Sequence, residues 1–453
     1  EYLIFSLSQL EIPQVGKGRI VVVEYSSPNI AKPFGIGHLR STIIGQALYN
    51  LYQALGYTTV GDNHLGDWGT QFGKIIYMIK KDNTADYSIE NLEKLYVQYH
   101  QLAEADPSLE EEGRRWFKKL ESKDPEARRI WQKCVDVSLA EFDRIYQLLG
   151  VKIDNAYGES AYEDIMPGVI EDAQAKRVAK PSEGALVIEI PGEKTPLMLL
   201  KSDGATTYAT RDLATVKFRV EKWHPDLVIY EVGAEQALHF RQVFAASRLL
   251  GYVSDINSLI HTKHGLYLDT DGKKFATRKG KTIKLEEVLD EAIARAKKLG
   301  NSDAPTAQAV GIGAIKYFDL LHSIHSDIIF DWDKIMALEG NSGPYLQYTY
   351  ARCQSVLRKS KVKGQRSKLQ LKTQNYQFNT EELAVLRWIY RYGEVVEEAA
   401  VRYAPNLVCN FLYELAQRYN TFYNKHSILQ ADTQETSAFR LAITTSVGQV
   451  LKS

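Results

Sequence analysis

The sequence lacks any long hydrophobic run, and no stretch approaches the roughly 20 apolar residues that a membrane-spanning helix needs. We therefore expect no membrane association. The start of the chain, EYLIFSLSQL, lacks both an initiator methionine and the pattern of a secretory signal, so we expect it to be the remnant of a longer protein. No period of about 20 to 50 residues repeats, which excludes a solenoid.

Cysteine is scarce, and the three residues Cys134, Cys353 and Cys409 lie far apart. This spacing fits neither a zinc knuckle nor a disulfide framework, and it predicts buried, reduced thiols. Net charge is also absent, because 56 basic residues balance 56 acidic ones. The balance argues against non-specific coating of nucleic acid, although it allows a segregated RNA-binding face. We expect a cytoplasmic protein and leave an organelle open.

The first pattern along the sequence is a strand, a glycine loop, a helix and a second strand. This order is typical of a doubly wound α/β domain. Residues 19–25, RIVVVEY, are a β-branched run that predicts a buried parallel strand. Residues 38–56 carry apolar side chains at helical spacing and end at Gly56, which suits the position after a helix. The segment YTTVGDNH then predicts a second strand.

Later segments divide between strand and helix patterns. From about Asp67 to Gly150 the chain is polar and helical, which predicts an insertion between two halves of the sheet. Strand patterns resume at ALVIEI (185–190) and LVIYEVG (227–233), and a helix, HFRQVFAASRLLG, follows the latter. From about Pro305 strand signals fade and long helices take over.

These patterns predict an α/β fold with a doubly wound, Rossmann-type parallel sheet and a helical insertion, followed by an all-α helical bundle. We expect the following boundaries: 1–18 as the remnant of an N-terminal domain or linker, 19–304 as the α/β domain with its insertion at about 70–150, 305–344 as a helical connection, and 345–453 as the bundle.

Residues 32–42, KPFGIGHLRST, form a candidate phosphate loop. Gly35 and Gly37 let the backbone approach an anion, and the helix from His38 would direct its free N–H groups at it. Lys32 can add a mobile cation. Two such glycines alone are also common in ordinary turns, but the strand before and the helix after favour a nucleotide.

A second cationic loop, GKKFATRKGK at 272–281, precedes a helix expected from Leu285. By itself it is equally typical of an exposed basic hairpin. Two cationic loops in one α/β domain indicate a polyphosphate that is held from two sides, since such cations stabilise charge on phosphate oxygens.

The order of these blocks resembles the class I aminoacyl-tRNA synthetases, and specifically the arginyl-tRNA synthetases, over nearly the whole chain. EYSSPNIAKPFGIGHLRST matches the block with the histidine–x–glycine–histidine signature, and GDNHLGDWGTQFGK matches the block after the next strand. TTYATRDLA, VGAEQALHFRQVF, GKKFATRKG and EGNSGPYLQYTYAR match later blocks in the same order. The resemblance implies an ATP-dependent ligase that forms arginyl-adenylate and transfers arginine to tRNA(Arg), with Mg²⁺ bound to the ATP. We expect a monomer.

The resemblance also implies four sets of site residues. The catalytic set is Lys32, His38, Lys274 and Arg278. The arginine-binding set is Glu24, Asn29, Tyr208, Asp212 and Gln236. The ATP-binding set is Gly35, Gly37, His38, Gly233, Glu235 and Leu266. The set that contacts the tRNA anticodon is Tyr345, Tyr348, Tyr419 and Tyr423.

The arginine set suits the chemistry of a guanidinium group, which has five donors in a planar fork and no acceptor. Glu24 and Asp212 can neutralise and orient this fork, whereas lysine would leave part of the set unpaired. On a helix, Tyr208 and Asp212 would share one face because they are four residues apart.

Two departures from the family pattern bear on activity. Gly35 stands where the first signature histidine is expected, and the second lysine of the lysine–methionine–serine–lysine–serine loop is absent. By its position, Lys32 corresponds to the residue thought to compensate for that lysine. The alternative is a catalytically retired, tRNA-binding protein; the intact arginine set favours activity. A small nucleotidyltransferase would not explain the helical end.

The helical end carries two tyrosine pairs and a basic run. Tyr345 and Tyr348 are three residues apart and Tyr419 and Tyr423 four apart, so each pair would lie on one helix face and could stack on anticodon bases. The basic run 355–372 fits both a solvated loop and a contact with nucleic acid.

We expect no metal site. Four histidines could suggest one, but they come from different elements of the predicted fold. They are His261, His264, His322 and His325.

Overall fold

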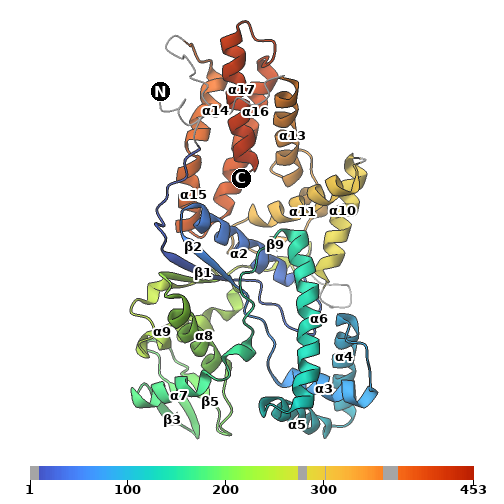
Figure 1. The fold of residues 1–453 in the computed structure, drawn as a ribbon, viewed down its shortest axis with the longest axis vertical. Coiled ribbons are helices and arrows are strands. Elements are labelled where there is room, and N and C mark those ends of the chain that lie inside the picture. Colours follow the sequence, from blue (N-terminus) through green and yellow to red (C-terminus); the bar gives the residue numbers. More distant parts are fainter. Residues whose placement is uncertain (1–9, 274–282, 301, 361–375, 453) are drawn as a thin grey trace.

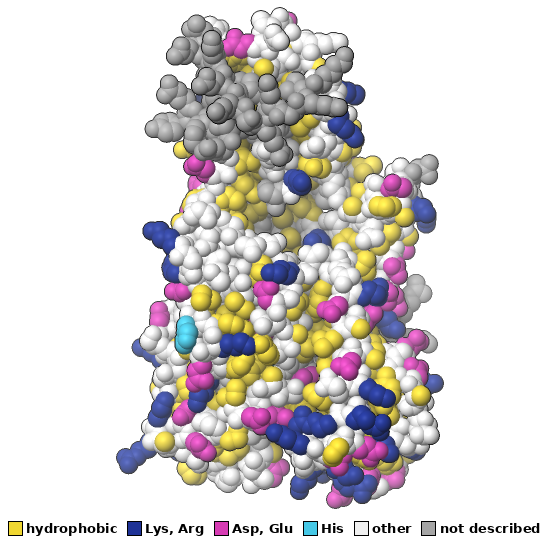
Figure 2. Space-filling view, viewed as in Figure 1, with side chains coloured by type: hydrophobic (Ala, Val, Ile, Leu, Met, Phe, Trp, Pro, Cys, Tyr) yellow, Lys and Arg dark blue, Asp and Glu magenta, His cyan; other side chains and the backbone are white. Residues whose placement is uncertain are grey.

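The computed structural model describes residues 10–273, 283–300, 302–360 and 376–452. A parallel sheet lies near the middle of the elongated molecule, and the C-terminal helices form a bundle at one end (Figure 1). At the other end lie a helical layer, α3 to α6, and beside it a smaller sheet with helices α7 to α9 (Figure 1). On the face in Figure 2 basic and acidic side chains are interspersed, as the balanced composition suggests.

The elements of the described residues have the following bounds. The strands are β1 (Ile20–Glu24), β2 (Thr58–Asp62), β3 (Ala179–Ser182), β4 (Ala185–Ile188), β5 (Leu197–Leu200), β6 (Leu227–Tyr230), β7 (Leu259–His261), β8 (Tyr267–Leu268) and β9 (Ile328–Ile329). The short 3-10 helices are η1 (Glu159–Tyr162), η2 (Ala234–Gln236) and η3 (Ile256–Ser258). The α-helices up to the bundle are α2 (Gly37–Ala54), α3 (Thr70–Asp82), α4 (Ile89–Ala105), α5 (Leu109–Glu121), α6 (Pro125–Leu149), α7 (Met166–Ala175), α8 (Tyr208–Trp223), α9 (Ala237–Leu249), α10 (Leu285–Gly300), α11 (Ala304–Leu320) and α12 (Trp332–Ile335). The bundle helices are α13 (Gly343–Lys359), α14 (Thr380–Tyr390), α15 (Tyr392–Val401), α16 (Asn406–Lys425) and α17 (Gln434–Lys452).

The central sheet has the strand order β2-β1-β6-β7, and every neighbouring pair is parallel. Its first strand is buried along nearly its whole length, which confirms the β-branched run as an inner strand. The chain leaves β1 on one side for β2 and reaches β6 on the other, so the carboxyl ends of β1 and β6 form a topological switch point. In doubly wound sheets such a point is where ligands bind.

Helix α2 confirms the predicted glycine loop, helix and strand unit. Gly56 follows the helix with a φ of 81°, the left-handed conformation expected of it. Gly45 lies on the side of α2 that faces β1: a Cβ there would come within 2.1 Å of the Cβ of Tyr25. The absence of a side chain at this position therefore allows the helix to pack close to the sheet.

The predicted helical insertion is present as α3, α4, α5 and α6. The longest of these, α6, starts at an Asp124 cap whose carboxylate accepts the N–H groups of Glu126 and Ala127. It ends at Gly150, which has a φ of 63°. Its buried face packs against the loop that precedes α2, so the insertion also supports that loop.

Two strand predictions need correction. The segment 185–190 does contain a strand, β4, but it belongs to a separate antiparallel sheet in the order β3-β4-β5. A tight turn at Glu183 and Gly184, both with positive φ, folds β3 back on β4. A short apolar run predicts a strand but does not predict the strand with which it pairs. A strand also occurs beyond Pro305, since β9 pairs in parallel with β8.

The C-terminal bundle shares one apolar core with the sheet. Buried side chains from β1 and α2 belong to the same cluster as those of α14, α16 and α17. The hydroxyl of Tyr52 on α2 donates to the carbonyl of Ala400 on α15, at 3.2 Å. The cysteines Cys134, Cys353 and Cys409 are all buried and free, as predicted. No helix of the described residues is long and apolar enough to cross a membrane.

Candidate active site

The switch point holds a buried cluster of charged side chains. Glu24 ends β1 and Asp62 ends β2, and the two are register partners. Arg219 of α8 reaches between them: Nη1 lies 2.5 Å from Oε2 of Glu24, and Nη2 lies 2.7 Å from Oδ2 of Asp62. The ring of Tyr230, at the end of β6, lies 5.1 Å from the guanidinium carbon. All four side chains are buried.

Two carboxyl groups here share one internal guanidinium. Burial raises the pKa of Glu24, and the pairing with Arg219 only partly offsets this. Burial likewise raises the pKa of Asp62. The pKa of Arg219 is raised, since its two acidic neighbours outweigh its own burial. With both carboxylates ionised the cluster carries one net negative charge, so a second guanidinium nearby would stabilise it.

Asp212 lies close to this cluster, one turn into α8. Its Oδ2 contacts Nε2 of His239 from α9, and its Oδ1 lies 3.9 Å from Nε2 of His64 in the segment after β2. Burial lowers the pKa of His64. Burial also acts to lower the pKa of His239, but the hydrogen bond and charge of Asp212 outweigh it and raise that pKa.

The other predicted arginine ligands lie at the starts of α8 and α9 and in the segment after β1. Tyr208 is the first residue of α8, one turn before Asp212, and its ring is 67% exposed. Gln236 occupies the N-cap position of α9, one turn before His239, and is exposed. Helices α8 and α9 pack on each other, and the contact between Asp212 and His239 brings their first turns together.

Asn29 is brought in by the segment after β1. Its backbone forms an isolated parallel bridge with Gly66. A Cβ at Gly66 would lie 2.2 Å from Oδ1 of Asn29, so the glycine makes room for the amide. The roles of these five residues stay predictions, because no ligand is present to test them.

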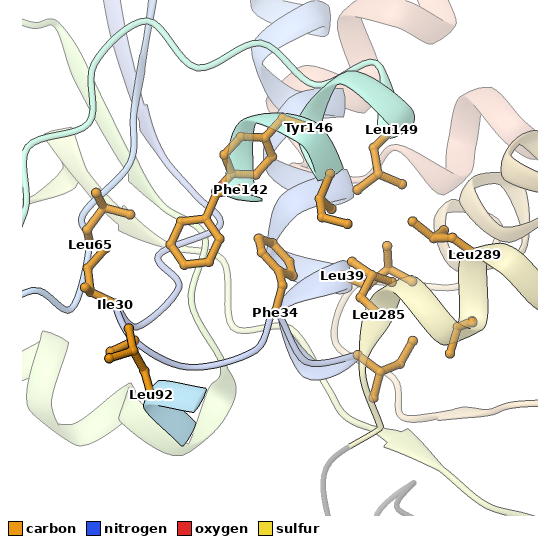
Figure 3. Packing of buried hydrophobic residues seen from close by; sticks show 14 of the residues in the cluster. Ile30, Phe34, Leu39, Leu65, Leu92, Phe142, Tyr146, Leu149, Leu285 and Leu289 are labelled. Carbon is orange, nitrogen blue, oxygen red and sulfur yellow. The ribbon is translucent and has the colours of Figure 1, made fainter. Parts of the chain in front are cut away.

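The predicted phosphate loop is anchored by Phe34. Its ring meets Phe142 and Tyr146 of α6 edge-on, with centroids 5.5 and 5.8 Å away. Figure 3 shows this ring between α6 and the apolar side chains Leu39 and Leu285. The loop is thus fixed through a buried side chain beside its glycines, while Gly37 faces open space.

The residues that follow the second predicted cationic loop meet the first loop through their backbones. Gly35 forms an antiparallel bridge with Lys284, and the N–H of Ile36 donates to the carbonyl of Ile283 at 2.9 Å. The N–H of Leu285 donates in turn to the carbonyl of Phe34 at 2.8 Å. The segment 283–285, just before and at the start of α10, therefore lies beside the first loop. Lys274 and Arg278 themselves lie outside the described residues.

Lys32 and His38 bracket the glycines of the first loop. Lys32 is exposed, and its Nζ lies 5.4 Å from the ring centroid of Tyr96 on the insertion helix α4. His38 is in the first turn of α2, with its ring edge-on to Phe34 at 5.4 Å. No side chain caps this helix start, and no acidic residue lies in its first turn. The helix start thus suits an anion.

The three remaining ATP predictions gather after β6 and β7. Gly233 forms a parallel bridge with His264, and the carboxylate of Glu235 folds over it: a Cβ at Gly233 would lie 2.4 Å from Oε2. Leu266 exposes its side chain, while its N–H donates to Asp327 at 2.7 Å. Its carbonyl accepts the N–H of Ile328 at 2.8 Å, so the side chain is the part of Leu266 left for a contact with ATP.

The predicted anticodon tyrosines do not share one environment. Tyr348 and Tyr423 are 60% and 37% exposed, and the guanidinium of Arg352 lies 5.0 Å from the first ring and 4.7 Å from the second. Tyr345 is half-buried and accepts a hydrogen bond from Asn420. Tyr419 is fully buried, so the prediction that it stacks on a base is corrected: its ring packs in the bundle core.

The four histidines that might suggest a metal are engaged separately. His264 pairs with Glu231, and the rings of His261, His322 and His325 donate to backbone carbonyls of Val232, Phe318 and Lys263. Within the described ranges, no three His, Cys, Asp or Glu side chains are grouped so that they could hold a metal ion.

Comparison with protein families assigns the chain. A family model described as "tRNA synthetases class I (R), catalytic domain" matches residues 3–332, well over half of the chain. The chain belongs to the class I arginyl-tRNA synthetase family. A second model, described as "DALR anticodon binding domain", matches residues 346–453.

Individual relatives agree with this family. The arginine–tRNA ligase of Chloroflexus aggregans is 43% identical over 456 residues, which cover 97% of this chain and 78% of that protein. The arginyl-tRNA synthetase of Plasmodium falciparum has a TM-score of 0.82 at 27% identity, over 100% of this chain and 80% of that one. The Thermus thermophilus enzyme has a TM-score of 0.85 at 23% identity, over 99% and 83%, and bears on the fold alone. None of these relatives supports the retired alternative.

Sequence reasoning missed several charged residues of this family site. Arg219 received no role at all, and Asp62, His64, His239 and Arg352 were only part of matched blocks. One signal was available: Arg219 follows Asp212 by seven residues, two helical turns, so both lie on the same face of α8. The pairings themselves depend on how β1, β2, α8 and α9 converge, which no single segment encodes.

Proposed function

We propose that this protein ligates L-arginine to tRNA(Arg) in translation, with ATP as the energy source. The observation that carries the proposal is the placement of Glu24 and Asp212 at the switch point of the sheet. They lie there with a loop suited to phosphate close by, at the start of α2. Two carboxylates next to a nucleotide loop suit a substrate that has a guanidinium at one end and a carboxylate to activate at the other.

In the first step a carboxylate oxygen of arginine attacks the α-phosphorus of ATP. A new O–P bond forms, the bond between the α-phosphorus and the bridging oxygen breaks, and pyrophosphate leaves. The chain's own contribution is positioning and charge stabilisation. We assign Glu24, Asn29, Tyr208, Asp212 and Gln236 to hold arginine in place for this attack.

On the phosphate side, we assign Lys32, His38 and the start of α2 to the ATP phosphates, with Lys274 and Arg278 from the second loop. Gly35, Gly37, Gly233, Glu235 and Leu266 complete the nucleotide site. Mg²⁺ enters with ATP as part of the substrate and supplies charge neutralisation on the phosphates.

In the second step a ribose hydroxyl at the tRNA 3′ end attacks the adenylate carbonyl. An ester forms and AMP leaves, so no covalent enzyme intermediate is needed. We assign residues 345–453 to anticodon binding, with Tyr345, Tyr348 and Tyr423 at the surface or half-buried there. A monomeric state and a cytoplasmic location stay predictions.

The test is arginine charging by the purified chain with ATP, Mg²⁺ and arginine tRNAs. We expect arginyl-tRNA to form only when arginine, ATP and an arginine tRNA are all present. When lysine replaces arginine, we expect no aminoacylated tRNA. If no arginine tRNA is charged while tRNA binding is retained, the proposal fails and a retired tRNA-binding protein takes its place.

A further inference from the structure

A histidine contacts the predicted arginine ligand Asp212 in this structure. His239 directs Nε2 at Oδ2 of Asp212, within hydrogen-bonding distance. The other carboxylate oxygen lies 3.9 Å from Nε2 of His64. The side chains of Asp212 and His239 are 24% and 28% exposed, so a small solute can reach the pair. Both oxygens that a guanidinium fork would use thus face ring nitrogens.

We propose that protonated His239 competes with the substrate guanidinium for the carboxylate of Asp212, so that arginine binding expels a proton from His239. The inference rests on the proposed function, because it takes Asp212 as a ligand of arginine. His239 acts through Asp212 and is therefore a positioning residue. Its proton sets how readily the carboxylate is released to the substrate.

The physical reason is that one carboxylate cannot serve two cations equally well. An imidazolium on Oδ2 neutralises Asp212 and takes up the direction of a guanidinium N–H. If arginine binds beside it, two positive charges share one negative charge at close range. Loss of the imidazolium proton removes this repulsion, and a neutral ring can still donate one N–H to Asp212.

The surroundings of His239 leave Asp212 as the group that controls its proton. Asp212 raises the pKa of His239 against the lowering effect of burial. Burial lowers the pKa of His64, which lies near the other carboxylate oxygen. The ring of His261 packs against Phe240, with the ring centroids 4.7 Å apart. Burial is the main cause that lowers the pKa of His261. The pKa values of the two imidazoles beside Asp212 are thus shifted in opposite directions.

The elements packed against α9 present these other ionisable groups in the described part of the chain. They are Tyr208, Arg211, Asp212, Lys217, Arg219, Glu221 and Lys222 on α8, Glu235 on η2, His261 on β7 and Asp255 before η3, while β5 is apolar. On α9 itself, Arg241 pairs with Glu193 on the outer side, at 2.5 Å. Of these, Asp212 is the charged group that shifts the proton affinity of His239.

The sign of the pH effect follows from linkage. The free protein holds the His239 proton more tightly than the arginine complex does, because arginine adds a second positive charge beside it. Lower pH therefore favours the free protein. Arginine affinity should fall as pH falls through the pKa of His239 in the free protein, by up to about tenfold per pH unit for one proton.

The experiment is isothermal titration calorimetry of L-arginine into the full chain, from about pH 6 to about pH 8.5, where an imidazole titrates. Two buffers of different ionisation enthalpy report the number of protons released. We expect a fraction of a proton released per arginine at the acid end, declining toward zero at the alkaline end. The Kd should rise in parallel at low pH.

His239→Gln keeps an N–H donor for Asp212 but cannot titrate, so its Kd should not depend on pH over this range. His426→Gln is the matched control, since His426 also contacts a carboxylate, that of Glu381 at 3.1 Å, far away in the bundle. It should behave like the native protein. Proton release that persists in His239→Gln would overturn the inference.

The native titration alone decides the matter if the variant does not fold: a flat Kd with no proton release refutes the role of His239. Charging assays on the same native preparation separate the two claims. Charging with a flat Kd contradicts only this inference, whereas arginine binding without charging of any arginine tRNA contradicts the proposed function.

Discussion

At the scale of single residues, Lys32 is the first side chain to test. It is exposed beside the phosphate loop, and its Nζ lies 5.4 Å from the ring centroid of Tyr96. If it supplies the cation missing from the second loop, Lys32→Ala should lower kcat by about ten- to a thousandfold with little change in the KM for arginine. Steady-state charging kinetics at saturating tRNA would measure both values.

The matched control for this variant is Lys94→Ala, which removes an exposed lysine from α4, the helix that carries Tyr96. Its kinetics should match those of the native protein. An unchanged kcat in Lys32→Ala would rule out a role for Lys32 in the chemical step.

A second residue-scale prediction concerns Asp212. Asp212→Asn keeps the shape but removes the negative charge that faces a guanidinium, a loss of about 2 kcal/mol or more. We expect the KM for arginine to rise at least about 30-fold, with the KM for ATP nearly unchanged. Asp172→Asn is the control. Asp172 on α7 pairs at 2.8 Å with Lys217, which lies on α8 like Asp212 but outside the site. A similar KM in both variants would exclude Asp212 as an arginine ligand.

At the scale of elements, the phosphate loop depends on its contact with the insertion. Phe34 is 4% exposed and packs edge-on against two aromatic rings of α6. Phe34→Ala should cost about 3–5 kcal/mol of stability and should also raise the KM for ATP, because the glycines lose their anchor. Phe439→Ala removes a ring of similar burial from the bundle. Phe439→Ala should lower the stability, measured by thermal unfolding, about as much as Phe34→Ala does. It should not raise the KM for ATP.

The elements also show what the sequence could and could not predict. The run RIVVVEY and the helix after it were predictable because a β-branched run and apolar residues at helical spacing are local signals in the sequence. The sheet to which β4 belongs was not, since pairing is decided by the turn at Glu183 and Gly184. The pairs of Arg219 with Glu24 and of His239 with Asp212 join segments far apart in the sequence. The identities of the arginine set came from the family resemblance.

At the scale of the whole molecule, the catalytic sheet and the helical bundle form one continuous core. Buried side chains of β1 and α2 pack with those of α14, α16 and α17, and Tyr52 bonds to the backbone of α15. The helix that starts at the phosphate loop is therefore in direct contact with the helices expected to hold the anticodon. The two parts of the chain are thus joined through packed side chains of the described residues.

The last prediction separates the exposed face of this bundle from its core. Tyr348 and Tyr423 flank the guanidinium of Arg352, a flat and accessible surface for unpaired bases. Tyr348→Ala should raise the KM for tRNA by about 5- to 150-fold, the equivalent of about 1–3 kcal/mol for one lost stack, with the KM for arginine little changed. Arg352→Ala should act in the same direction.

Tyr419→Phe is the control, because the buried ring of Tyr419 donates its hydroxyl to Thr444 and meets no solvent. It keeps the ring in the bundle core and removes only the hydroxyl, so it should leave the KM for tRNA unchanged. If Tyr348→Ala and Tyr419→Phe both leave the KM for tRNA at the native value, the anticodon must bind on another face of the bundle.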